Sequence, residues 1–280
     1  MKVKIVADSG CEISKQLIEN EDCGYDKVPL SLHLEDRVYV DDESLDVDEF
    51  LQHMEASPTH VKSASPSPQN FLDKFMVGES VFAVTLSAKI SATYQSAMMA
   101  KRMYLEEYGK KFIHIFDSLS ASIGEGLVAL KIVECTKKEL SNMEIVEHVN
   151  KFIKSMRTYF LIDKFDTLVK SGRINPYVAK LASMLNIKPI CGADENGNIT
   201  MFDKARGYNK AVKRLIEMIK ENIPDPENRI LGISHVRCYE KAIGFRDELL
   251  KVIKVKDVII EEASGLISTY ASRGGFVVAL

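Results

Sequence analysis

The stretch VFAVTLSAKISATYQSA, residues 81–97, combines the patterns of a strand, a polar crossing and a helix. Residues 81–84 are all apolar, which is typical of a buried strand, and a helical pattern follows from Ala92. The crossing carries four hydroxyl groups, on Ser87, Ser91, Thr93 and Tyr94. A strand followed by a helix is the repeating unit of α/β proteins, so this stretch predicts a parallel sheet covered by helices.

The same alternation continues through the first half of the chain. Apolar strand patterns occupy residues 3–6, 27–34, 81–86 and 112–116. Helical patterns begin near Ile13, Val47, Phe71, Ala92 and Ile123. We therefore expect an α/β fold with a mainly parallel sheet flanked by helices.

The second half adds a different kind of sheet. Strand patterns occupy residues 158–162, 187–193, 198–203, 229–236 and 255–263. Asn196 and Gly197 form a short polar break between two of them, which predicts a hairpin and hence a mixed sheet. Because 280 residues exceed what one core usually fills, we expect two domains, residues 1–157 and 158–280.

Composition excludes several classes of protein. The formal net charge of −3 and the scattered Lys and Arg residues argue against binding to nucleic acid. The five cysteines are widely spread and form no C-x-x-C pair, which argues against disulfides and zinc. The chain begins with a strand pattern and has no apolar run long enough for a membrane span. We expect a soluble, cytoplasmic protein.

Familiar nucleotide and catalytic motifs are missing. The sequence has no phosphate-binding loop, no complete G-x-G-x-x-G, no G-x-S-x-G and no H-E-x-x-H. The acidic run at 41–50 lacks the central glycine of a calcium loop and is interpreted as a solvated loop with acidic residues near a helix N-terminus. We therefore predict no catalytic residues, no metal and no nucleotide cofactor in this chain.

Loops rich in hydroxyl groups remain as the candidate site. They occupy residues 7–14, 62–68, 87–95 and 117–126, close to the ends of predicted strands or the starts of helices. Ligands of open α/β sheets bind at the carboxyl edge of the strands. Ser and Asp at these positions also serve as helix N-caps, which is the simpler interpretation of each loop alone. Hydroxyls and free amides without a general base suit the binding of an anion, such as a carboxylate or phosphate.

Four segments resemble motifs of the DegV family. KSASPSP is similar to T-S-Q-P-S-P, ISATYQSA to L-S-G-T-Y-Q-S-A, DSLSASIGEG to D-S-x-x-x-S-x-G-x-G, and VKSGRI to L-K-K-G-G-R-I. The resemblance implies a bacterial two-domain α/β protein that encloses a long-chain fatty acid and needs no cofactor. It also implies a carrier rather than an enzyme, which could present the lipid to a separate, ATP-binding fatty-acid kinase subunit.

The resemblance also implies residues that bind the head group. Ser63 and Ser91 match the family's threonine and serine, and the backbone N–H of Ala92 could add a donor. Thr93 is a weaker candidate because it could only cap the helix. Tyr270 stands where LISTYASRGG matches the histidine of G-T-H-T-G-P-G. Since tyrosine does not readily become a cation, this replacement puts phosphoryl transfer to the carboxylate in doubt.

Two arginines could supply the positive charge or contact a partner. Arg173 matches the arginine of the family's G-G-R-I segment, although Gly172 beside it also fits a plain helix end. Arg273 replaces the proline of the family's C-terminal motif, and its alternative is an exposed turn residue.

The tail requires an apolar interior. Two apolar stripes are available for its lining, although such stripes most often belong to the core: Met98, Met99 and Met103 in the first half, and Met184, Leu185, Ile187 and Ile190 in the second. Two alternatives stay open. One is an enzyme for a small phosphorylated or carbonyl substrate, related to dihydroxyacetone kinases, and the other is a regulatory protein that senses an acyl ligand.

Overall fold

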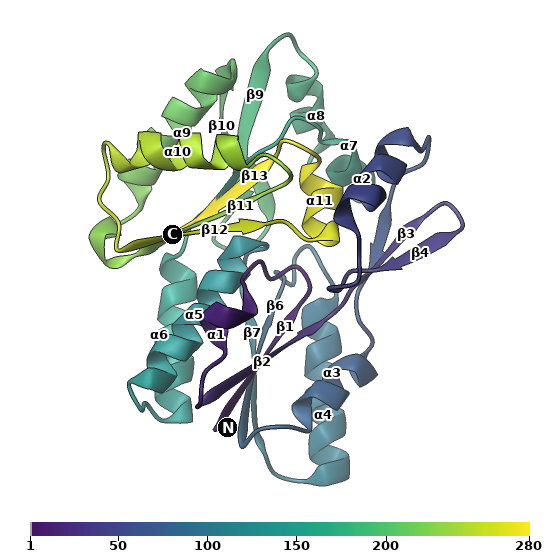
Figure 1. The fold of residues 1–280 in the computed structure, drawn as a ribbon, viewed down its shortest axis with the longest axis vertical. Coiled ribbons are helices and arrows are strands. Elements are labelled where there is room, and N and C mark those ends of the chain that lie inside the picture. The colour runs from purple at the N-terminus through teal and green to yellow at the C-terminus, as the bar shows by residue number, and fades with distance from the viewer. Residues whose placement is uncertain (1) are drawn as a thin grey trace.

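The computed structural model describes residues 2–280. Two sheets lie one above the other, with helices between them and on their outer faces (Figure 1). None of the helices within residues 2–280 is long and apolar enough to cross a membrane. The strands of the four-stranded sheet all precede Arg157, and those of the six-stranded sheet all follow it.

The four-stranded sheet is entirely parallel, as predicted. Its order is β2-β1-β6-β7, with bounds Cys23–Val28, Val3–Asp8, Ser80–Thr85 and Phe112–Asp117. Every residue of the central strands β1 and β6 is buried, because helices cover both faces. Helices α3 (Pro68–Phe75) and α4 (Thr93–Tyr108) pack on one face, and α5 (Ile123–Lys137) and α6 (Asn142–Ser155) pack on the other.

The six-stranded sheet is mixed, which confirms the second prediction. Its order is β10-β9-β8-β13-β11-β12, with bounds Ile199–Arg206, Ile187–Ala193, Thr158–Leu161, Phe276–Ala279, Ile230–His235 and Asp257–Glu262. Strands β9 and β10 form the antiparallel hairpin predicted at Asn196 and Gly197, whereas β11 and β12 are parallel. Helices α9 (Tyr208–Asn222) and α10 (Tyr239–Leu250) pack on this sheet.

Helix α5 contacts both sheets: β1 and β6 of the first and β11 and β13 of the second. The largest apolar core accordingly contains Ile5 and Phe82 from one sheet and Val277 and Ala279 from the other. The division into domains 1–157 and 158–280 therefore stays a prediction, since this core runs across it.

A small antiparallel sheet projects from the first half of the chain (Figure 1). Its strands β4 (Arg37–Val40), β3 (Ser31–Leu34) and β5 (Lys62–Ala64) accompany helix α2 (Val47–Ala56). Segment 27–34, predicted as one strand, is two strands of different sheets. The pairing of β2 ends at Val28 because Pro29 has no N–H to donate. Strands β4, β5 and β13 were not predicted.

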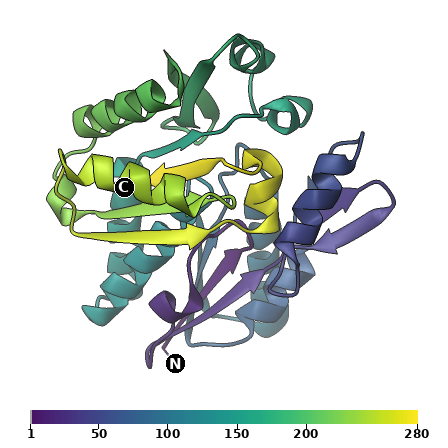
Figure 2. The same cartoon turned by 45° about the horizontal axis from the view of Figure 1, so that its top comes forward.

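Helix α11 (Gly265–Ala271) lies between α2 and the start of β13, as both views show (Figures 1 and 2). The remaining short helices are α1 (Lys15–Ile18), α7 (Asp166–Lys170), α8 (Pro176–Ala182) and the 3-10 turn η1 (Pro226–Asn228). Helix α11 packs against both α2 and α7, so it joins the small sheet to the second half of the chain.

Candidate functional site: a cavity between the sheets

A cavity of about 110 Å³ lies where the loops after β6 and β7 meet β8 and α11. We call it the central cavity. Most of its lining is apolar and includes Leu30, Leu86, Phe160, Ile162, Leu266 and Val277. This space is several times what one water molecule needs, and apolar cavities of that kind stay dry and take up apolar ligands.

Strand β8 forms one long wall of the central cavity. The cavity is lined by Thr158 and Phe160 on β8 and by Ile162 directly after the strand, as expected for alternate residues that share one face of an extended segment. With a rise of about 3.3 Å per residue, Thr158 and Ile162 lie roughly 13 Å apart. The cavity therefore extends along β8 for most of the strand's length.

Polar groups converge on the cavity from four different segments of the chain. Ser63 is on β5, Tyr270 is on α11, and their hydroxyl oxygens lie 2.8 Å apart. Ser91, in the loop before α4, and Arg173, beyond α7, also line the cavity. The structure thus brings together four of the seven predicted site residues. We call these four residues the polar mouth.

Ser91 is held in place by the loop it belongs to. Its N–H donates to the carbonyl of Ser87 at 3.1 Å, and the Ser87 hydroxyl donates to the carbonyl of Gly197 in the β9–β10 turn at 2.8 Å. The Ser91 hydroxyl lies 2.7 Å from that of Thr93 and accepts the Thr93 N–H at 3.3 Å. Thr93 is buried and is the first residue of α4, whereas Ala92, the N-cap residue of that helix, is exposed. Neither residue lines the central cavity.

Arg173 is oriented by two backbone carbonyls. Its Nε donates to the carbonyl of Ile90 at 3.0 Å, and its Nη1 donates to that of Ser171 at 3.1 Å. The guanidinium carbon lies 5.9 Å from the centre of the Tyr270 ring, within the range of a cation–π contact. The remaining Nη2 donates no hydrogen bond to any group within residues 2–280, so a permanent cation with a spare donor lines the cavity.

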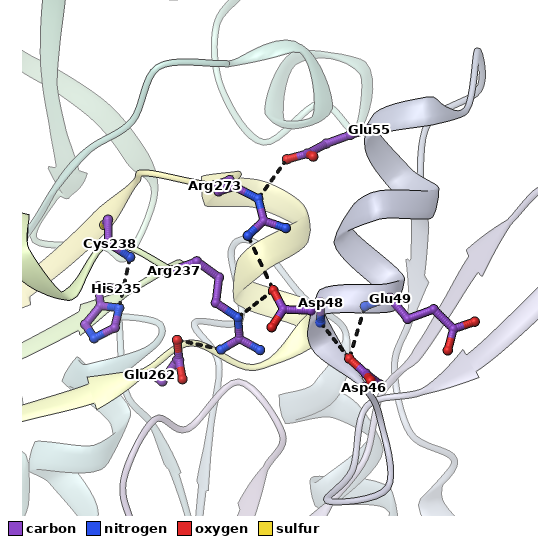
Figure 3. A network of polar contacts seen from close by, with 9 residues as sticks. All are labelled: Asp46, Asp48, Glu49, Glu55, His235, Arg237, Cys238, Glu262 and Arg273. Atoms are coloured by element: carbon purple, nitrogen blue, oxygen red, sulfur yellow. Dashed lines mark hydrogen bonds and ion pairs between the residues drawn. The ribbon is translucent and has the colours of Figure 1, made fainter.

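Arg273 is part of a different arrangement (Figure 3). Its Nη1 lies 3.3 Å from Asp48 and its Nε 3.3 Å from Glu55, both on α2. Asp48 also accepts from Arg237 at 3.0 Å, and Arg237 pairs in turn with Glu262. The pKa of Asp48 is lowered, chiefly by the hydrogen bond from Arg237. Arg273 therefore ties α2 to the end of α11 and does not line the cavity.

The apolar stripes expected to line the tail site lie elsewhere. Met98 and Met103 pack in the core between the first sheet and its helices α3 and α4, and Ile190 packs in the core under α9. Met99, Met184 and Leu185 are exposed. None of these residues, nor Ile187, lines the central cavity, because its apolar side chains come mainly from β8, β13, α11 and the loops instead.

Three hydroxyl-bearing residues of the lining were not singled out from the sequence: Ser120, Ser122 and Thr158. The first two belong to the hydroxyl-rich loop 117–126, so that loop was the available signal. Thr158 had no signal of its own, since it stands as the first residue of an ordinary strand pattern. Its hydroxyl lies 2.7 Å from that of Ser120.

A group of buried carboxyl groups lies beside the cavity. Asp8 is fully buried and accepts the N–H groups of Gly10 at 2.9 Å and of Leu86 at 2.8 Å. Burial nevertheless raises its pKa to about 7. Burial also raises the pKa of Glu12 to about 8, although its carboxylate accepts the N–H of Ser264 at 2.8 Å. Burial, with the neighbouring Asp8 and Glu12, raises the pKa of Glu125 well above its usual value.

These carboxyl groups support the cavity rather than line it. Leu86, held by Asp8, is part of the lining, and Ser264, held by Glu12, is the N-cap of α11. Lys27 provides the nearby positive charge that partly opposes the rise in the pKa of Glu12. The sequence signal was again a loop that follows a buried strand, residues 7–14.

The chain is similar to known proteins over nearly its whole length. The model of the family described as "Uncharacterised protein, DegV family" matches residues 2–280. A DegV domain-containing protein of Streptococcus pneumoniae is 32% identical over 278 residues, which cover 99% of this chain and 98% of the relative.

Solved structures agree over the whole chain. A DegV family protein from Ruminococcus gnavus, described with vaccenic acid, is 36% identical with a TM-score of 0.94, covering 99% of each chain. The Fatty Acid Kinase (Fak) B3 protein of Streptococcus pneumoniae, loaded with linoleic acid, is 30% identical with a TM-score of 0.94, covering 100% of this chain and 99% of that one. A DegV family protein from Eubacterium eligens, loaded with heptadecanoic acid, is 27% identical with a TM-score of 0.92, covering 99% and 98%.

Proposed function

Because this chain belongs to the DegV family, we propose that it binds one long-chain fatty acid in the central cavity. The carboxylate lies at the polar mouth and the tail runs along β8. The observation that carries this proposal is the convergence of Ser63, Ser91, Tyr270 and Arg173 on a cavity whose other walls are mainly apolar. The fatty acids bound to similar structures support it.

Each group of the polar mouth has a role that fits a carboxylate. The hydroxyls of Ser63, Ser91 and Tyr270 donate hydrogen bonds, and each can turn to do so. Arg173 supplies the counter-charge that a half-buried carboxylate needs. In this role it replaces the positive charge that the family histidine would provide and that Tyr270 lacks. Ala92, Thr93 and Arg273 have no part in this proposal.

The free energies of the two kinds of contact indicate that the tail determines the affinity and the head group determines the orientation. Burying one methylene contributes about 0.8 kcal/mol, so a chain of about sixteen carbons contributes on the order of 12 kcal/mol before the cost of ordering it. A charge-assisted hydrogen bond contributes about 1.5 to 3 kcal/mol, and desolvation of the carboxylate offsets much of that. In this proposal residues 158–280 supply most of the tail wall, and residues 1–157 supply two of the head-group hydroxyls, those of Ser63 and Ser91.

The chain acts as a carrier in this proposal and leaves catalysis to a partner. A carboxylate held at the mouth is placed for transfer of a phosphoryl group by a separate, ATP-binding fatty-acid kinase subunit in the cytoplasm. Similarity to the Fak B3 protein supports this partner. The fatty acids found in similar structures favour a carrier over the alternative of an enzyme for a small phosphorylated or carbonyl substrate.

The experiment is extraction of lipid from the natively purified protein, followed by mass spectrometry and by titration of the delipidated protein. We expect a stoichiometric long-chain fatty acid and tight rebinding. The corresponding fatty alcohol should bind more weakly, because it lacks the charge that Arg173 balances. A folded protein that carries no lipid and binds no fatty acid would contradict the proposal.

A further inference from the structure

The central cavity and a groove on the outer surface share one wall. The outer groove is lined by residues that include Met156, Tyr159, Phe202 and Met218. Thr158 and Ala193 line both the central cavity and the outer groove. Resting on the proposed function, we propose that Thr158 is the stop against which the end of the fatty acid chain packs, and that it sets the longest chain this protein binds.

The direction of the cavity places Thr158 at its far end. A Cβ at Gly275 would lie 2.4 Å from the carbonyl of Ala271 and 3.0 Å from Ile162. Ile162 is therefore beside Ala271, the last residue of α11. Ala271 directly follows Tyr270 of the polar mouth. Thr158 lies at the opposite end of β8, about 13 Å away by strand geometry. A chain that starts at the mouth and follows β8 meets Thr158 last.

The stop is held rigidly. The Thr158 hydroxyl lies 2.7 Å from that of Ser120. A Cβ at Gly124 would lie 2.1 Å from Ser120 Oγ, and a Cβ at Gly192 would lie 2.1 Å from the carbonyl of Thr158. Helix α5 and strand β9 thus pack their bare backbone directly around the pair. The hydroxyl and the backbone of Thr158 are therefore held in place when a chain end packs against them.

Its chemistry also suits a stop. The Ser120 hydroxyl donates to the carbonyl of Ala121 at 3.3 Å and accepts from the Thr158 hydroxyl, so an apolar chain end can pack there without leaving a polar group unpaired. Only the thin wall of Thr158 and Ala193 separates this end from the outer groove, whose volume is about 360 Å³. Removing the Thr158 side chain therefore opens a path from the cavity to additional apolar surface.

The experiment measures Kd for the saturated fatty acids from decanoic to docosanoic acid, with the delipidated protein. In the wild-type protein we expect Kd to fall about fourfold for each added methylene up to a limit, beyond which affinity no longer rises. In Thr158→Ala the limit moves to chains longer by about two carbons. In Ala193→Val, which thickens the same wall, it moves to shorter chains.

Two comparisons keep the result specific. Thr158→Val keeps the bulk of the side chain and loses only the hydroxyl, so its limit stays with the wild type. Decanoic acid is too short to reach the wall and should bind all variants within about twofold, which checks that they fold. An unchanged limit in Thr158→Ala, or a valine variant that shifts as far as alanine, overturns the proposal. A wild-type protein without any dependence on chain length contradicts the proposed function itself.

Discussion

The hydroxyls of Ser63 and Tyr270 lie 2.8 Å apart, although the two residues are 207 positions apart in the sequence. One belongs to the small sheet and the other to α11, so the polar mouth exists only where these two units meet. The glutamate side chain of Glu12 and the ion pairs of Arg273 fix the two ends of the same helix. Precise placement of α11 is therefore a condition for binding the carboxylate.

The first prediction concerns the hydroxyls of the mouth. Replacing Ser63 and Ser91 together by alanine should weaken fatty-acid binding by about tenfold or more, because two donors to a carboxylate are lost. The melting temperature should stay close to that of the wild type, since both side chains are only partly buried. Isothermal titration measures the affinity, and scanning calorimetry measures the melting temperature. Ser96→Ala, on α4 and outside the cavity lining, is the control. Unchanged affinity would remove both serines from the site.

The second prediction separates the two arginines. Arg173→Gln should weaken binding of a fatty acid by about 10- to 150-fold while leaving the matching fatty alcohol nearly unaffected, because only the acid carries the charge. Arg273→Gln should leave both affinities within about twofold, since Arg273 pairs with Asp48 and Glu55 outside the cavity. Titrating both ligands into both variants tests this. Equal losses for acid and alcohol in Arg173→Gln would show that the arginine supports the fold rather than the charge.

The third prediction follows from the buried carboxyl groups. The pKa values of Asp8 and Glu12 are raised by burial to about 7 and about 8, above their values in an unfolded chain. Their protonated forms are favoured in the folded state, so this stability is complete at low pH and is lost as pH rises through these two values. The melting temperature should therefore fall by several degrees from about pH 6 to about pH 9.

Glu12→Gln tests the origin of this slope. Its amide oxygen can still accept the N–H of Ser264, but it no longer titrates, so the fall above about pH 7 should be smaller. Glu147→Gln, at an exposed residue paired with Lys151, serves as the control and should keep the wild-type slope. A wild-type melting temperature that rises from about pH 6 to about pH 9 would contradict this prediction. It would show that the buried carboxyl groups do not determine how stability depends on pH.

The fourth prediction uses two glycines. Gly192→Ala places a Cβ 2.1 Å from the carbonyl of Thr158 and should destabilise the protein by about 1 to 3 kcal/mol. Gly244→Ala, in α10, meets no atom within 4 Å and should stabilise the protein slightly, because alanine favours a helix. Thermal unfolding of both variants measures the difference. Similar melting temperatures for the two would show that β8 and β9 can separate at little cost.

The parts of the fold that could be predicted are those with a strong local signal. The strands β1 and β6 are buried throughout and mostly apolar because both faces of the sheet are covered, and the Asn196–Gly197 turn fixes the β9–β10 hairpin. Strand β13 is only four residues long and follows two glycines, and β5 has three residues, so neither carries a recognisable period. Each of these two segments is a strand because it pairs with neighbouring strands, and its own sequence gives no such signal.

The site shows the same division. Ser63, Ser91 and Tyr270 could be expected at a common place because they resemble motifs of a known family, and all three line the cavity. The loop 7–14 drew attention to Asp8 and Glu12, but neither their role nor that of Thr158 could be predicted, because these roles come from contacts with residues that are distant in the sequence. Arg273 shows the converse, since its position in the motif gives no hint of the ion pairs with α2.

Helix α5 carries a consequence for engineering. It lies against strands of both sheets, and Gly232 of β11 approaches it so closely that an added Cβ would lie 2.5 Å from Ile123. Expressing either half of the chain alone would expose an apolar face of this helix or of the second sheet to water. Chimeras between relatives should therefore exchange α5 together with β11 and β13, or keep all three from one parent.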